Sequence, residues 1–283
     1  MAIRGKSAVR FSADLARIAG LPVTLHEDGQ LSFGTDVEIE DAGVRKVRSL
    51  CRVALDRPAC EAAPEEQPAY FMYNGVIRAG DKATVADWNL RFELTSIPAG
   101  RIGRECAKTL GHRHNLRGGS SQRDAEVCEV IHGVAHFLFE FRGQTAGEPS
   151  VVYYVEGKTG DKILFPPDTL HLTINPGAET CIFTDVVVRG LSGDYADFQS
   201  TQGASYHEIC EGGGTLFERN AGYRMVPELR RVQPREYPAL GLTKVVPLYT
   251  AFLERGPEWR FLKHPEAFWE TFGKLKAEIG LQE

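Results

Sequence analysis

The sequence predicts a mainly β fold, an antiparallel barrel or a double-sheet jelly roll, over residues 69–190. Two observations lead to this prediction. Short strand-like segments rich in aromatic and β-branched residues follow one another along this stretch, and turns containing glycine or proline separate them. No helical pattern intervenes between the segments, which is typical of all-β barrels and sandwiches rather than of α/β folds.

The expected strands alternate with clear turn signals, such as Pro98-Ala99-Gly100 and Pro176-Gly177. Most of these segments have hydrophobic residues on one face, so the barrel is expected to enclose a substantial core. The strands are expected at 70–73, 88–97, 106–114, 126–131, 134–141, 151–156, 162–165, 171–174 and 181–188.

The chain on either side of the barrel has a different pattern. Residues 1–68 read as an N-terminal arm with a helix at 12–18, strands around Asp28-Gly29, a helical segment at 44–55 and a proline-rich surface connection at 57–68. Residues 206–283 form a C-terminal extension. It contains a loop at 212–214 and ends in an amphipathic helix at 265–275, which is expected to pack on the barrel or on a partner subunit. The barrel unit itself is placed at 69–205.

Composition limits the classes of function. The chain has 283 residues, of which 42% are hydrophobic and 25% are charged, as in ordinary globular proteins. A formal net charge of -5 excludes a general basic field for nucleic acid or anionic membranes. No segment resembles a signal peptide or a membrane span, so a cytoplasmic location is expected. No C-x-x-C pair occurs, and reduced thiols are expected at all six cysteines, Cys51, Cys60, Cys106, Cys128, Cys181 and Cys210.

Three histidines and one carboxylate stand in two clusters. His112 and His114 are two residues apart on a predicted strand, so their side chains point the same way, about 6–7 Å apart. Glu126 opens the next predicted strand, and His171 lies on the more polar face of the alternating segment 170–175. Neighbouring strands can bring these side chains together, and the four residues are therefore predicted to hold one divalent metal ion.

An isolated His-x-His pair is more often a pair of surface or hydrogen-bonded histidines than a metal site. The presence of Glu126 and His171 favours metal binding here. A set of three imidazoles and one carboxylate suits Fe(II) or Mn(II), with Zn(II) and Ni(II) as alternatives, and it differs from cysteine-based structural zinc sites.

Several motifs occur together in the barrel region. They are the run from Leu94 to Glu105, the string Thr109-Leu110-Gly111-His112-Arg113-His114, the segment Ala125-Glu126-Val127, the segment 160–175 with Pro166-Pro167 and Asn175, and the pair Asp194-Tyr195. In this combination the chain resembles the cupin-type (archaeal-type) phosphoglucose isomerases. The resemblance covers residues 70–205, and the combination is far more selective than the His-x-His pair, which marks any cupin.

The resemblance implies a cupin barrel, a double-stranded β-helix, that interconverts glucose 6-phosphate and fructose 6-phosphate. It implies one metal ion held by His112, His114, Glu126 and His171, and catalytic roles for Glu126 and His171. The positions that match sugar-phosphate contacts of the family are Tyr70, Thr95, Thr109, Gly111 and Tyr195. Because the family commonly forms homodimers through the region before the barrel, the N-terminal arm is expected to contribute to a dimer.

This chain departs from the family pattern at two places. The segment 115–125 is longer than expected by about five residues, and a longer surface loop is favoured over a lid or a phosphate contact. Cys128 replaces the tyrosine that usually follows the glutamate ligand by two residues, which leaves the exact substrate open. Strict strand alternation also puts Thr109 on the face opposite His112, so a bulge near Gly111 is needed to bring both into one site.

Two routes for the isomerisation stay open at the level of sequence. A base such as Glu126 can move a proton between C1 and C2 through an enediol, or a hydride can shift directly between the two carbons. Two other functions also stay open: another cupin metalloenzyme such as a dioxygenase, and a non-catalytic sugar-phosphate-binding cupin, which Cys128 makes plausible.

Overall fold

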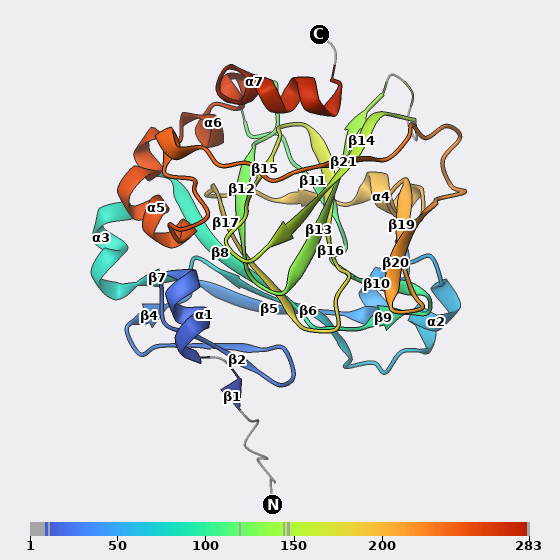
Figure 1. Ribbon diagram of the computed structural model, residues 1–283, viewed down its shortest axis with the longest axis horizontal. Coiled ribbons are helices and arrows are strands. Elements are labelled where there is room, and N and C mark those ends of the chain that lie inside the picture. Colours follow the sequence, from blue (N-terminus) through green and yellow to red (C-terminus); the bar gives the residue numbers. More distant parts are fainter. Residues whose placement is uncertain (1–8, 11, 119, 144, 146–147, 282–283) are drawn as a thin grey trace, which may run out of the picture.

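The computed structural model describes residues 9–10, 12–118, 120–143, 145 and 148–281. Two curved β sheets form its centre (Figure 1), which confirms the predicted mainly β fold. The first sheet has the strand order β15-β12-β17-β8-β6-β5, and its neighbouring strands run antiparallel. Its strands are β5 (Asp41–Lys46), β6 (Pro68–Asn74), β8 (Leu90–Ile97), β12 (Glu126–His132), β15 (Lys162–Phe165) and β17 (Cys181–Val188).

The second sheet has the order β20-β19-β10-β16-β13-β14-β21, and β11 pairs with both β16 and β18 beside this path. The hairpin of β19 and β20 extends this sheet, and its turn falls within the loop predicted at 212–214. The strands are β9 (Arg101–Ile102), β10 (Glu105–Lys108), β11 (His112–His114), β13 (Val134–Arg142), β14 (Pro149–Lys158), β16 (Thr169–Asn175), β18 (Gly193–Asp194), β19 (Tyr206–Glu211), β20 (Gly214–Arg219) and β21 (Arg230–Val232).

Aromatic side chains from both sheets meet in the core between them. Phe137 of the second sheet lies 5.7 Å from Phe183 of the first, measured between ring centroids, and Phe139 lies 4.8 Å from Phe165. The Phe165 ring in turn lies 4.9 Å from the His171 ring. The packed interior therefore continues up to the residues that the sequence marked as metal ligands.

The N-terminal arm differs from its prediction in two places, one of which is that the surface connection predicted at 57–68 begins with the helix α2 (Arg57–Ala62). Of the helical segment predicted at 44–55, residues 44–46 belong to the edge strand Asp41–Lys46, whose pairs with β6 include Ala42 with Tyr73, and residues 47–50 form only a 3₁₀ helix. A spacing of three between apolar residues does not separate a helix from a strand followed by a turn, and sheet pairing decided the outcome. The other elements are β1 (Val9–Arg10), α1 (Ser12–Ala19), β2 (Val23–His26), β3 (Leu31–Phe33), β4 (Val37–Glu38), the 3₁₀ helix η1 (Val47–Leu50), α2 (Arg57–Ala62), β7 (Ile77–Arg78), η2 (Ala79–Asp81) and α3 (Lys82–Val85).

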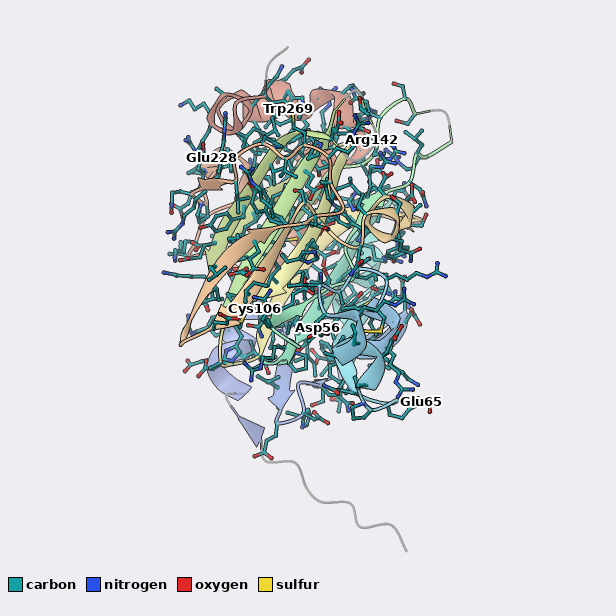
Figure 2. The ribbon with its side chains drawn as sticks, turned by 90° about the vertical axis from the view of Figure 1, so that its right-hand side faces the viewer. Asp56, Glu65, Cys106, Arg142, Glu228 and Trp269 are labelled. Atoms are coloured by element: carbon teal, nitrogen blue, oxygen red, sulfur yellow. A yellow bond between two sulfur atoms is a disulfide. The ribbon has the colours of Figure 1, made fainter. Side chains whose placement is uncertain are left out.

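Helix α7 (Phe268–Ile279) lies at the end of the molecule opposite α1 and β1, as Figures 1 and 2 show, with Trp269 labelled in Figure 2. The predicted amphipathic tail is the helix α7, and its Trp269 ring lies 6.2 Å from Phe141 of the barrel. In the part of the chain that the structure describes, no helix combines the length and the hydropathy needed to cross a membrane. The elements are α4 (Ala196–Ser200), η3 (Pro238–Leu240), α5 (Leu248–Arg255), η4 (Gly256–Glu258), α6 (Arg260–Lys263), η5 (Pro265–Ala267) and α7 (Phe268–Ile279).

Helix α5 is docked on the barrel through aromatic contacts. The Phe252 ring, 1% exposed, lies 5.5 Å from Trp88 and 6.1 Å from Phe92 of β8. We expect Phe252→Ala to lower the free energy of unfolding by about 3–5 kcal/mol, because it removes a buried ring and leaves a cavity. Urea denaturation at equilibrium measures this loss. Val245→Ala, at a residue that is 87% exposed in the same extension, is the control, and equal midpoints for the two variants would contradict the packing described.

The side chain of Glu140 of β13 is buried on the far side of the second sheet from the metal-ligand candidates, because its neighbour Phe139 is the cross-strand partner of His171. The Ser205 N–H and the Tyr223 hydroxyl both donate to its carboxyl group. Burial raises the pKa of Glu140 from 4.5 to about 7. Between these two values the folded state binds more protons than the unfolded state, so the stability that the neutral carboxyl provides is lost as pH rises through this window.

We therefore expect the wild type to lose roughly 3 kcal/mol of stability relative to Glu140→Gln between pH 4.5 and 7, because glutamine stays neutral. Urea denaturation of both proteins at several pH values gives this difference directly. A difference in stability that does not change with pH would show that Glu140 ionises normally in the folded protein.

The cysteines also differ from expectation. Cys51 is bonded to Cys60, and Cys106 is bonded to Cys210, so the prediction of reduced thiols is wrong for four of the six residues. Cys128 and Cys181 are free and buried. Sequence spacing did not indicate the pair Cys106–Cys210, which are 104 residues apart, because their proximity arises from the pairing of β10 with β19.

Candidate active site

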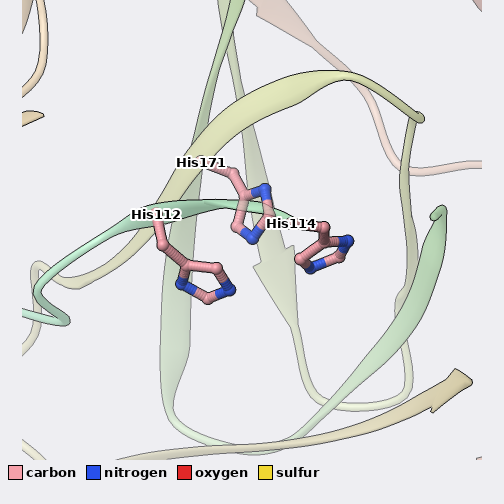
Figure 3. Close-up of side chains that lie close together, drawn as sticks. All are labelled: His112, His114 and His171. Atoms are coloured by element: carbon pink, nitrogen blue, oxygen red, sulfur yellow. The ribbon is translucent and has the colours of Figure 1, made fainter. Parts of the chain in front are cut away.

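Three histidine rings converge inside the barrel (Figure 3). His112 and His114 stand on β11, and His171 stands on β16, where it is the direct cross-strand partner of His112. Ring centroids lie 4.6 Å apart for His112 and His171, 4.8 Å for His114 and His171, and 5.4 Å for His112 and His114. One ring nitrogen from each residue lies within 4.8 Å of the others.

Local sequence explains how β11 presents its two histidines. Alternation puts His112 and His114 on one face of the strand. Gly111, with a φ of 74°, breaks the strand between β10 and β11, and a Cβ there would come within 2.8 Å of Phe198. This break resets the alternation, so Thr109 and His112 both line one cavity although they are three residues apart. The irregularity predicted near Gly111 is therefore present.

Glu126 begins β12 and contacts one of the three histidines. Its Oε2 lies 3.2 Å from His114 Nε2. Two donor atoms that bind one ion at about 2.1 Å lie about 3.0–3.4 Å apart, so this distance suits two ligands of the same metal. The other oxygen, Oε1, accepts a hydrogen bond of 2.9 Å from the Cys128 thiol. Burial raises the pKa of that thiol, so Cys128 remains a neutral donor.

The protonation of the histidines fits a metal site. Both ring nitrogens of His171 are buried and have no hydrogen-bond partner among the residues that the structure describes. Burial lowers the pKa of His112 to about 3, and burial followed by the neighbouring His112 and His114 lowers the pKa of His171. Burial also opposes the charge of His114, but Glu126 outweighs it and raises the pKa of that imidazole. His112 and His171 are therefore neutral imidazoles, the form that a metal ion requires.

The tautomer of His114 follows from its second nitrogen. His114 Nδ1 lies 2.8 Å from the backbone carbonyl of Asp124, which can only accept, so Nδ1 carries the hydrogen. His114 Nε2 is then left with its lone pair on the side of Glu126 Oε2, which lies 3.2 Å away. Segment 115–125 was expected to be a surface loop, but Asp124 is only 2% exposed and lies directly behind a candidate ligand.

A cavity of about 400 Å³ opens in front of this cluster. That volume is in the range of small-molecule sites. All five positions matched to sugar-phosphate contacts line it, namely Tyr70, Thr95, Thr109, Gly111 and Tyr195. His112, His171 and Glu126 also line it, while His114 stands behind Glu126. The structure thus brings together every site residue that the sequence singled out.

Sequence reasoning missed two acidic residues in the cavity wall. Glu93 of β8 and Asp185 of β17 are direct cross-strand partners, and both line the cavity. Burial raises the pKa of Glu93 to about 7. Burial, followed by the nearby Glu93 and Glu126 carboxylates, raises the pKa of Asp185. Strand alternation could have identified Glu93 from the sequence, because Glu93 is two residues before Thr95 and lies on the same face of the strand.

A cationic residue was also missed. Arg45 of β5 pairs across the strands with Tyr70, and its guanidinium carbon lies 5.8 Å from the centre of the Tyr195 ring. Its buried Nε has no hydrogen-bond partner among the described residues. Because 44–55 was predicted to be a helix, the sequence offered no reason to place Arg45 beside the cavity.

Comparison with known proteins shows the family to which this chain belongs. A family model described as "Glucose-6-phosphate isomerase (GPI)" matches residues 44–225. Three curated relatives named glucose-6-phosphate isomerase come from Thermococcus gammatolerans, Thermococcus litoralis and Thermococcus onnurineus, with 23%, 26% and 29% identity. The matches cover 64%, 69% and 60% of this chain and 90%, 95% and 81% of those proteins, respectively.

Solved structures resemble a smaller part of the chain. An oxalate oxidase in complex with glycolate is 14% identical with a TM-score of 0.27, covering 38% of this chain and 47% of its own. An oxalate decarboxylase mutant from Bacillus subtilis is 16% identical with a TM-score of 0.29, covering 44% of this chain and 27% of its own. Scores this low describe partial likeness of the β fold and carry nothing about the chemistry of this site.

Proposed function

Because this chain belongs to the glucose-6-phosphate isomerase family, we propose that it is a metal-dependent aldose–ketose isomerase that interconverts glucose 6-phosphate and fructose 6-phosphate. One observation carries the metal dependence: two imidazoles with lowered pKa values and a third with an unpartnered nitrogen converge at one cavity. The cavity, of about 400 Å³, is large enough for an open-chain hexose phosphate.

In this proposal His112, His114, Glu126 and His171 hold one divalent ion, with Fe(II) or Mn(II) first and Zn(II) or Ni(II) as alternatives. When bound, such an ion acts as a Lewis acid that polarises the sugar carbonyl and stabilises charge developing on its oxygen. Cys128 donates to Glu126 Oε1, which orients the carboxylate and leaves Oε2 beside His114.

The phosphate is proposed to bind at the Thr95, Thr109 and Gly111 part of the wall. Hydroxyl groups donate readily to phosphate, and a glycine lets an anion approach the backbone closely. Thr109 Oγ1 accepts from the Thr173 N–H at 3.0 Å, which leaves its own hydrogen free to donate. Tyr70 and Tyr195 complete this part, and the nearby Arg45 supplies a positive charge with an unused donor.

We propose that a proton moves between C2 and C1 of the substrate on Glu93 rather than on Glu126. A carboxylate that binds a metal ion is a weak base, whereas Glu93 lines the cavity outside the ligand set. A base works best when its pKa is near the operating pH, and the pKa of Glu93 is raised to about 7. Incorporation of solvent deuterium into fructose 6-phosphate supports this route, and its absence supports a direct hydride shift.

A coupled assay with fructose 6-phosphate tests the whole proposal. Activity should vanish after EDTA treatment and return when Mn(II) or Fe(II) is added. Oxygen uptake without isomerisation would instead indicate a dioxygenase. No turnover together with a thermal shift on adding fructose 6-phosphate would indicate a binding module, the alternative that Cys128 suggested.

The remaining proposals rest on the family resemblance. The chain is divided into the N-terminal arm 1–68, the barrel 69–205 and the extension 206–283, and the arm is proposed to join two subunits. Light scattering during size-exclusion chromatography measures the mass of the assembly against the 31.3 kDa of one chain. A cytoplasmic location also stays a prediction. Disulfides are more typical of oxidising compartments, and this chain has two, so cell fractionation is the appropriate test.

A further inference from the structure

The segment 115–125 is tied to the candidate metal site through Asp124. The Asp124 carbonyl accepts the hydrogen bond of 2.8 Å from His114 Nδ1. This bond sets both the tautomer and the ring orientation of His114. Partners of this kind, one bond removed from the metal, commonly change metal affinity by about 10- to 100-fold when they are lost.

Asp124 is itself held by a single side chain. Arg117 Nε donates to Asp124 Oδ1 at 2.7 Å, and the buried Asp124 Oδ2 has no hydrogen-bond partner in the described part of the chain. The Asp124 carboxylate is about 1% exposed, so without Arg117 it would be a buried and uncompensated charge. A buried carboxylate in that position has to move toward another donor or toward water. Either response disturbs the carbonyl that His114 uses.

Arg117 also reaches the C-terminal extension. Its Nη2 donates to the Lys263 carbonyl at 2.8 Å. Lys263 is the last residue of α6, whose final carbonyls lack partners within the helix. Phe261 and Leu262 of the same helix are buried in the core, so the Lys263 carbonyl is held in place. Helix α6 lies outside the residues 44–225 that match the family model.

We infer that Arg117 is a positioning residue that clamps Asp124 between His114 and helix α6, and that through it the C-terminal extension sets the metal affinity of the barrel. The inference rests on the proposed function, because it assumes that His114 is a metal ligand. It gives one shared role to two segments of this chain, the longer segment after His114 and the helices after the barrel.

The test uses the full-length protein stripped of metal and titrated with Co(II). We expect Arg117→Ala to weaken Co(II) binding by about 10-fold and Arg117→Lys to weaken it less, because lysine keeps the charge beside Asp124 but cannot make both bonds. In ¹⁵N spectra of the metal-free protein, the His114 ring should change from one tautomer to an exchanging pair in Arg117→Ala. The lysine variant keeps the test decisive if the alanine variant does not fold.

Arg235→Ala is the matched control, because Arg235 forms an ion pair of 2.7 Å with Glu278 within the extension, and neither residue lines the cavity. Its Co(II) affinity and His114 spectrum should equal those of the wild type. Wild-type affinity and an unchanged His114 spectrum in both Arg117 variants would overturn the inference while leaving the proposed function intact. A wild-type protein that binds no Co(II) would overturn the proposed function and the inference with it.

Discussion

Replacing His112 by alanine is expected to reduce bound metal from about one ion per subunit to less than about 0.1, and kcat/KM for fructose 6-phosphate by at least about 1,000-fold. His112 belongs to the cluster whose ring nitrogens lie within 4.8 Å of one another. With one imidazole gone, two histidines and Glu126 hold the ion less tightly, and the sugar carbonyl loses its Lewis acid. Elemental analysis and the coupled assay measure the two effects.

The fold should tolerate this change, because the site faces a cavity and His112 is partly exposed. His264→Ala is the control, since His264 lies on the surface with its side chain 56% exposed. It should keep both metal and activity. A His112→Ala protein with normal metal content would show that the three histidines are a hydrogen-bonding cluster rather than a metal site.

The second large effect is expected at Glu93. Glu93→Gln should lower kcat by about 100- to 1,000-fold, with KM and bound metal changed by less than about threefold, because the amide fills the same space but cannot accept a proton. The variant keeps an oxygen that can accept from Arg91, so the ion-pair partner is not left without a hydrogen bond. Steady-state kinetics of the metal-loaded enzyme separate kcat from KM.

Glu218→Gln is a matched control, because Glu218 forms a similar pair with Arg104 on the surface, with distances of 2.8 and 2.9 Å. It should leave kcat unchanged. If Glu93→Gln retains its kcat and the product carries no solvent deuterium, the reaction proceeds by hydride shift. Glu93 then serves only to balance Arg91.

Local sequence patterns predicted much of this structure. Period-two alternation was sufficient to predict the barrel strands and to put His112 beside His114, because a strand directs every second side chain to one face. The amphipathic tail was predicted for the same kind of reason, since α7 buries the apolar positions Phe268, Phe272 and Leu275. The motif from Thr109 to His114 also indicated the family that the relatives confirm.

Other features depended on neighbours that are distant along the chain. The pairing of β8 with β17 brought Glu93 opposite Asp185, and the pairing of β10 with β19 brought Cys106 to Cys210. Arg117 finds its acceptor 146 residues away at Lys263. Local sequence carries the conformational preferences of each strand and helix, whereas pKa values, disulfides and long-range hydrogen bonds arise only when the packed fold has removed these groups from water and placed them side by side.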